Sequence, residues 1–169
     1  MTRTSLLGAS LLWLLLAGAS GASAQVLGGC DAATLGDPPR SAFQCGGGLV
    51  IEAEAAQALR LVSGDASPER VSVESGAVFV EIAPRAGSFQ ILTPHAIASV
   101  RGTVFAVDVE EGRTSVLVLE GEVGVSRPDG SETVSLGAGE GVDVAPAEPL
   151  VVRTWGQGRV SALLARFGR

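Results

Sequence analysis

Hydrophobic residues after position 70 recur at every second position in short runs. Val71 and Val73 fall on one face of an expected strand, and Val78, Val80 and Ile82 fall on one face of the next. This alternation predicts half-buried β-strands, because successive side chains of a strand point to opposite faces. The pattern continues at Phe89 and Ile91, at Ile97, at Phe105, Val107 and Val109, and at Val123 and Val125.

One run, residues 116–119, is hydrophobic at every position. A continuous run of this length predicts a strand that is covered on both faces. Residue types that favour turns separate the runs, at 110–112, 127–130 and 137–139. Strands spaced by about 8–12 residues with such turns indicate an all-β domain. We therefore predict short strands in a solenoid-like arrangement or in a sandwich or roll.

Three segments depart from the alternation. Hydrophobic residues within 158–167 lie at helical spacing, which predicts a C-terminal helix that packs on the sheet. Residues 52–60 are rich in alanine and favour a short helix, while a strand through Leu49 and Ile51 competes with it. Residues 30–48 contain two consecutive prolines and three consecutive glycines, so we expect a loop there.

Residues 1–24 have the three parts of a secretory signal peptide. Arg3 makes the start positive, a hydrophobic run covers residues 6–19, and Ala22-Ser23-Ala24 provides a cleavage site of small residues. The run is shorter than the roughly 20 apolar residues that span a bilayer. We expect cleavage after Ala24, no transmembrane segment in the mature chain, and a periplasmic or secreted location.

Cys30 and Cys45 are the two cysteines of the chain. In an exported chain such a pair indicates a disulfide, which closes residues 25–48 into a leading loop. Two alternatives stay open: two free thiols, or acylation of Cys30, because residues 27–30 resemble a lipobox. Two cysteines and one distant histidine do not make a four-ligand metal site, so we expect no metal and no cofactor.

The charge of the chain bears on its partners. All 12 basic residues are arginines and face 18 acidic residues, which gives a net charge of −6. An acidic chain without a basic footprint favours neither nucleic acid nor an anionic membrane surface as a partner.

The segment 93–107, Thr-Pro-His-Ala-Ile-Ala-Ser-Val-Arg-Gly-Thr-Val-Phe-Ala-Val, resembles the core signature of the FecR domain. Later segments resemble its continuation, so that the resemblance covers residues 70–145. It implies a β-rich domain, residues 49–169 here, in the periplasm or at the cell surface. The regulator that gives the family its name passes a signal from an outer-membrane iron-siderophore receptor to a sigma factor. That regulator has a cytoplasmic segment and an internal transmembrane helix, whereas here a signal-peptide pattern leads into the domain.

Arg101-Gly102-Thr103 lies inside this segment. Glycine within a strand often marks a bulge or a close backbone approach. Arg101, with Thr103 beside it, is a candidate binding site for a carboxylate or phosphate group of a ligand. The competing interpretation, which we favour, pairs Arg101 with an internal carboxylate such as Glu120 or Glu140 and so joins two strands.

Trp155 and His95 are further candidates. Trp155 follows Arg153 and precedes the expected helix, so it is a candidate for stacking on a sugar, although a tryptophan that caps the β core is more common. His95 is the single histidine, and no Gly-x-Ser-x-Gly motif accompanies it. We interpret it as a turn residue and expect no catalytic residues.

Together these features predict a non-enzymatic exported protein of the FecR type that binds or scaffolds an envelope protein or glycan. Two alternatives remain. One is a regulatory sensor component of a cell-surface signalling system. The other is an envelope glycan hydrolase, which requires two carboxylates within about 5–10 Å across a groove.

Overall fold

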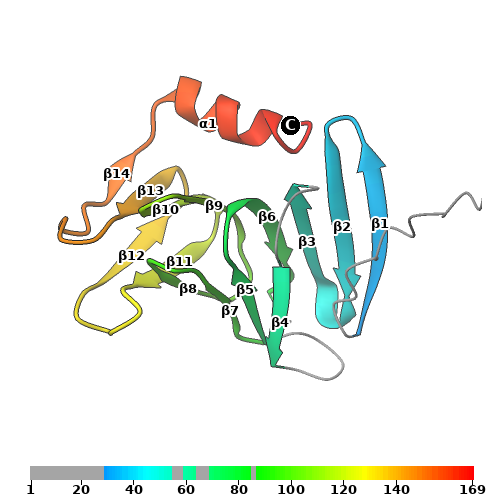
Figure 1. Ribbon diagram of the computed structural model, residues 1–169, viewed down its shortest axis with the longest axis horizontal. Coiled ribbons are helices and arrows are strands. Elements are labelled where there is room, and N and C mark those ends of the chain that lie inside the picture. Colours follow the sequence, from blue (N-terminus) through cyan, green and yellow to red (C-terminus); the bar gives the residue numbers. More distant parts are fainter. Residues whose placement is uncertain (1–28, 55–58, 64–68, 85–86) are drawn as a thin grey trace, which may run out of the picture.

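The computed structural model describes residues 29–54, 59–63, 69–84 and 87–169. They form two β-sheets and one α-helix, which lies on the outer side of the larger sheet (Figure 1). The expected signal peptide and its cleavage after Ala24 lie outside the described residues. No helix among the described residues is long and apolar enough to cross a membrane.

The larger sheet has eight antiparallel strands. In spatial order they are β1 (Cys30–Gly36), β2 (Pro39–Cys45), β3 (Leu49–Glu54), β6 (Gly76–Ile82), β9 (Val104–Glu110), β10 (Arg113–Glu120), β13 (Glu140–Val144) and β14 (Arg153–Thr154). A short 3-10 helix, η1 (Gly46–Gly48), connects β2 to β3.

The smaller sheet has six strands. In spatial order they are β12 (Thr133–Gly137), β11 (Glu122–Ser126), β8 (Ile97–Val100), β7 (Phe89–Leu92), β5 (Arg70–Val73) and β4 (Leu59–Ser63). β5 and β7 are parallel, and the other neighbours are antiparallel. The chain crosses between the sheets, because β5 and β6 follow each other in sequence but belong to different sheets.

Alternating hydrophobic residues form the core between the sheets. On the larger sheet Ile51, Val80 and Phe105 lie side by side, and all three are fully buried. Ile91 and Val125 of the smaller sheet belong to the same buried cluster. Each such side chain contributes about 1.5–3 kcal/mol of hydrophobic stabilisation. The predicted all-β class is therefore confirmed, with the two sheets packed as a sandwich.

β10 is covered on both faces, as its sequence predicts. Val118 faces the core between the sheets, whereas Leu117 points to the opposite side. There it packs with Leu163 and Phe167, which belong to α1 (Gln157–Ala165) and the turn after it. The predicted C-terminal helix is thus confirmed.

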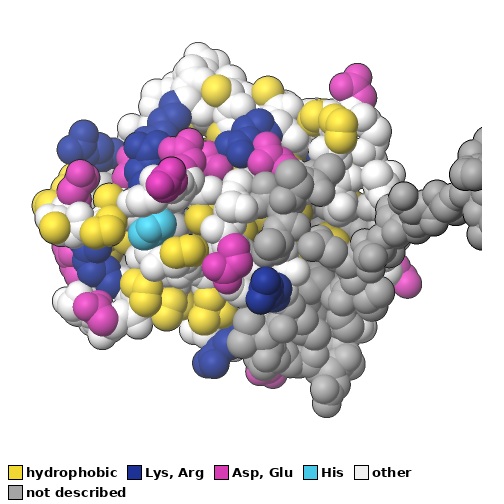
Figure 2. Space-filling view, viewed as in Figure 1, with side chains coloured by type: hydrophobic (Ala, Val, Ile, Leu, Met, Phe, Trp, Pro, Cys, Tyr) yellow, Lys and Arg dark blue, Asp and Glu magenta, His cyan; other side chains and the backbone are white. Residues whose placement is uncertain are grey.

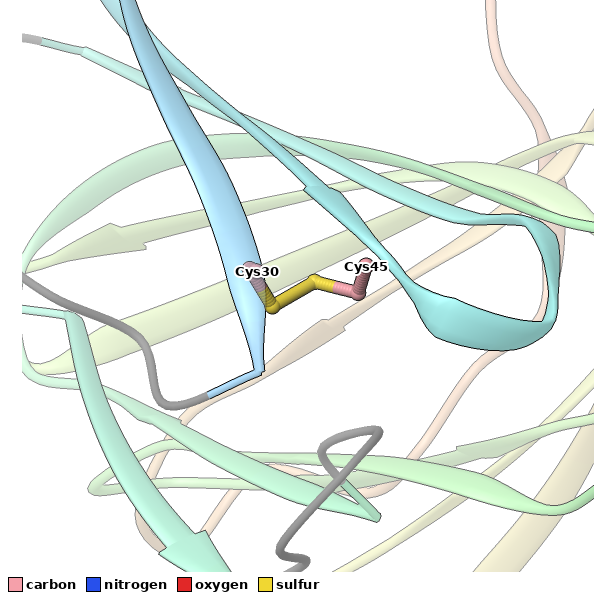
Figure 3. The surroundings of a disulfide bond; sticks show 2 residues. All are labelled: Cys30 and Cys45. Atoms are coloured by element: carbon pink, nitrogen blue, oxygen red, sulfur yellow. A yellow bond between two sulfur atoms is a disulfide. The ribbon is translucent and has the colours of Figure 1, made fainter.

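Residues 30–45 form a β-hairpin where the sequence predicts a loop. β1 and β2 pair over their full length, and the expected disulfide joins Cys30 to Cys45 at the open end of the hairpin (Figure 3). Phe43 is 1% exposed and anchors β2 in the core. The loop prediction is wrong because the short side chains of β1 show no hydrophobic alternation, and because Pro38 lies in the turn between the strands.

Candidate binding site

Three loops at one end of the sandwich surround an open pocket of about 690 Å³. They connect β7 to β8, β11 to β12 and β13 to β14. Four of the eight prolines of the chain line the pocket: Pro94, Pro128, Pro146 and Pro149. Because proline fixes its own φ angle, these loops have less backbone freedom than ordinary loops.

Arg127 joins two of these loops. Its Nε donates to Oε2 of Glu132 at 3.2 Å, its Nη1 donates to the carbonyl oxygen of Ala145 at 3.0 Å, and its Nη2 donates to the carbonyl oxygen of Glu148. Oε1 of Glu132 in turn accepts the backbone N–H of Leu150 at 2.9 Å. These bonds are charge-assisted and the Arg127 side chain is only 17% exposed, so they fix this wall of the pocket.

Thr93 fixes the third loop. Its Oγ1 accepts the backbone N–H groups of His95, at 3.3 Å, and of Ala96, at 2.8 Å. The same oxygen lies 2.9 Å from Oγ1 of the buried Thr114, which is also 3.2 Å from Nδ1 of His95. One ring nitrogen of His95 is thereby oriented towards the protein, as expected for a turn residue. Figure 2 shows the histidine side chain at the surface with hydrophobic side chains around it.

The pocket carries excess negative charge. Asp129, Glu132 and Glu148 supply three carboxylates, and Arg127 supplies one guanidinium group. The backbone N–H of Ser131, together with its hydroxyl, hydrogen-bonds to Asp129 and lowers the pKa of that carboxyl, which is therefore ionised at neutral pH. Such a site favours a cationic group that fits between proline rings.

Arg101 lies at the opposite end of β8 from the pocket. It is exposed and forms no ion pair with any acidic residue in the described parts of the chain. The predicted pair with Glu120 or Glu140 is therefore wrong. The physical reason is a turn: Gly102 has a φ of 65° and packs against Pro84, so Arg101 lies in this turn just beyond the end of β8. A role of Arg101 in ligand binding stays a prediction.

Thr103 is buried, with an exposed fraction of 1%. Its Cγ2 packs against Gly121, where an added Cβ would lie only 2.6 Å away. Its Oγ1 has no hydrogen-bond partner among the described residues. Thr103 therefore packs the start of β9, and its role in binding stays a prediction.

Trp155 lies on the outer side of the larger sheet. It is partly buried against the hydrophobic cluster beneath α1, and the guanidinium of Arg159 lies 3.4 Å from its ring centroid. It also borders a second hollow that includes Glu148 and Pro149. Because these two residues line the main pocket as well, Trp155 is the predicted binding residue that lies nearest to it.

Sequence reasoning missed the residues that build the pocket. The segment 127–130 was recognisable as a turn, but nothing local indicates that Arg127 binds carbonyl groups 18 and 21 residues away. The grouping of prolines from three loops is likewise visible only in the fold.

The pKa values of the carboxyl groups test whether the chain could be a glycan hydrolase. A glycosidase needs a carboxylic acid whose pKa is raised. Burial raises the pKa of Asp143, but hydrogen bonds from Arg159 and Ser115 outweigh it and lower the pKa. Glu52 follows the same pattern, with hydrogen bonds from Arg169 and Arg40. The pKa values of Glu52, Asp129 and Asp143 are thus all lowered, which is the opposite of what a general acid needs.

Comparison with known proteins identifies a family and solved structures that are similar to this chain. The family described as FecR protein matches residues 42–124. A crystal structure of a candidate anti-sigma factor from Parabacteroides distasonis ATCC 8503 has a TM-score of 0.61 and 21% identity, and the match covers 79% of this chain and 64% of that chain. A second structure of that description and organism has a TM-score of 0.49 and 22% identity, with coverages of 81% and 61%. This chain thus matches less than two thirds of either protein. No curated protein is significantly similar.

Proposed function

We propose that this chain, whose residues 42–124 belong to the FecR family, is a regulatory component of a cell-surface signalling system. The observation that carries the proposal is the FecR domain itself, in a fold shared with a candidate anti-sigma factor. This supports the regulatory alternative better than the scaffolding role that the sequence favours. Regulation of this kind requires binding and no catalysis.

We assign contact with a protein partner to the pocket at the end of the sandwich. Arg127 and Thr93 hold its loops in place before anything binds, and such preorganisation reduces the entropy lost on binding. Its proline rings offer an apolar surface, and its carboxylates offer acceptors for a basic side chain. An exported location is part of the proposal and rests on the signal-peptide pattern of residues 1–24.

The test is transcription in a strain that lacks the gene. Deletion should change a discrete group of transcripts, and the wild-type chain should restore them. Glu148→Arg reverses a charge in the pocket and should fail to restore them. Glu120→Arg makes the same charge change at an exposed position at the other end of the strands and should restore them. Unchanged transcription in the deletion strain, while the wild-type strain makes the protein, contradicts the proposal.

A further inference from the structure

β1 is an open edge of the larger sheet. It pairs only with β2 among the described strands, and Figure 1 shows it as the outermost strand, in blue. Its seven residues pair with β2 without a register shift. Every second backbone N–H and C=O of an edge strand points away from its neighbour, so β1 presents a row of groups able to pair with another strand.

The other sheet edges in the described parts of the chain offer less. β14 has two residues, β12 has five, and β4 has five with an irregularity in its pairing with β5. β1 is therefore the longest regular edge.

β1 also has few of the features by which proteins protect an edge. Such features are charged side chains, above all lysine, as well as proline and bulges. The sequence of β1 is Cys-Asp-Ala-Ala-Thr-Leu-Gly, with Asp31 as the one charged residue. The four consecutive residues from Asp31 to Thr34 are exposed, so both faces of the strand are accessible. The disulfide to Cys45 holds one end of the hairpin in place.

We propose that two copies of this chain pair antiparallel through β1, about a two-fold axis at Ala33. In this register Ala33 faces the partner's Ala33, Ala32 faces the partner's Thr34, and Asp31 faces the partner's Leu35. No like charges meet, and the small side chains at the centre allow close approach. Because the two strands are related by the two-fold axis, every contact away from the axis occurs twice, and the eight-stranded sheets join into one continuous sheet.

A second copy fits this edge better than a strand of another protein because β1 is complementary to itself in this register. The acidic residues that surround α1 lie on β3, β6, β9 and β13, and none of these strands is β1. Two chains of net charge −6 can thus approach through an edge strand whose seven residues carry a single charge.

The absence of tyrosine from the chain allows a direct test. Ala33→Tyr places one tyrosine at the axis, and photo-oxidation should join two copies through a dityrosine bond. Ser75→Tyr, at an exposed turn between β5 and β6, is the matched control and should stay uncrosslinked. In parallel, sedimentation of the wild-type chain should show a concentration-dependent doubling of mass.

Ala33→Arg opposes two guanidinium groups at the axis and should weaken the dimer by at least about tenfold, whereas Ser75→Arg should not. Thermal melting of each variant checks that the fold is intact. If Ala33→Arg does not fold, the comparison of the Ala33→Tyr and Ser75→Tyr variants still tests the proposed dimer. The proposal is overturned by a wild-type chain that stays monomeric at all concentrations. Equal crosslinking of the Ala33→Tyr and Ser75→Tyr variants, or crosslinking of the Ala33→Tyr variant to a foreign protein alone, also overturns it.

Discussion

At the scale of single residues, Arg127 is the side chain on which the pocket depends most. Replacement by alanine removes three hydrogen bonds, which Arg127 donates to Glu132 and to the carbonyl oxygens of Ala145 and Glu148. We expect Arg127→Ala to cost about 1–3 kcal/mol in the free energy of unfolding, measured by urea titration. The control is Arg113→Ala, since Arg113 is 45% exposed and pairs with the exposed Glu110, and it should change stability by less than about 0.5 kcal/mol. Equal effects of the two variants contradict the assigned role.

A substitution at Thr103 is expected to raise the stability of the protein. Its buried hydroxyl has no partner among the described residues, so Thr103→Val removes a desolvated polar group and keeps the shape. We expect a gain of roughly 1 kcal/mol and a higher melting temperature. Thr114→Val is the matched control, because the buried Thr114 hydroxyl contacts Thr93 and His95, and it should lower the melting temperature. A loss in both variants means that Thr103 has a partner in solution.

Arg101→Ala distinguishes the observed position of Arg101 from the one expected from its motif. A largely buried ion pair would cost about 3–5 kcal/mol when broken. Because Arg101 is exposed, we expect a change of less than about 0.5 kcal/mol in thermal or urea unfolding. A large loss of stability would mean that Arg101 does join two strands.

At the scale of elements, α1 and the turn after it are held on the sheet by arginine–carboxylate pairs. Arg166 bridges Glu54 and Asp108, and Arg169 pairs with Glu52. Burial raises the pKa of Glu52, but hydrogen bonds from Arg169 and Arg40 outweigh it and lower the pKa below its ordinary value of 4.5. Because the pKa of Glu52 is lowered in the folded state, its ion pair stabilises the fold above pH 4.5. This stabilisation is lost as the pH falls through the pKa that Glu52 has in the folded protein.

We therefore expect urea unfolding to show a stability that declines below pH 4.5, with a weaker decline in Glu52→Gln. Glu111→Gln changes an exposed turn residue and should follow the wild-type curve. If Glu52→Gln also follows the wild-type curve, Glu52 does not hold the C-terminal segment.

The elements differ in how far the sequence predicts them. Strands such as β9 and β10 could be predicted because hydrophobic residues alternate along them or follow one another without a break, and this pattern directly reflects which faces are buried. The hairpin of β1 and β2 was not, because its stability comes from pairing, from one buried phenylalanine and from a disulfide. The spacing of hydrophobic residues along the sequence indicates none of these three contributions.

At the scale of the whole molecule, the sandwich brings together loops that are distant in sequence. Pro94, Arg127 and Pro149 come from three loops and meet around one pocket only because β7, β11 and β13 end on the same side. The FecR signature could be recognised in the sequence, and its Pro94 and His95 line the pocket, but it does not show which other loops these residues meet. The pocket therefore cannot be predicted from the sequence without knowing how the strands pair.

The central claim is that this chain, whose residues 42–124 match the FecR family, acts by binding a protein partner at that pocket. Site-specific photo-crosslinking in living cells tests it most directly, with a photoreactive amino acid at position 148 and, as the control, at the exposed position 120. The account predicts one discrete protein adduct from position 148 that mass spectrometry identifies, and none from position 120. No adduct from position 148, or the same adducts from both positions, would contradict it.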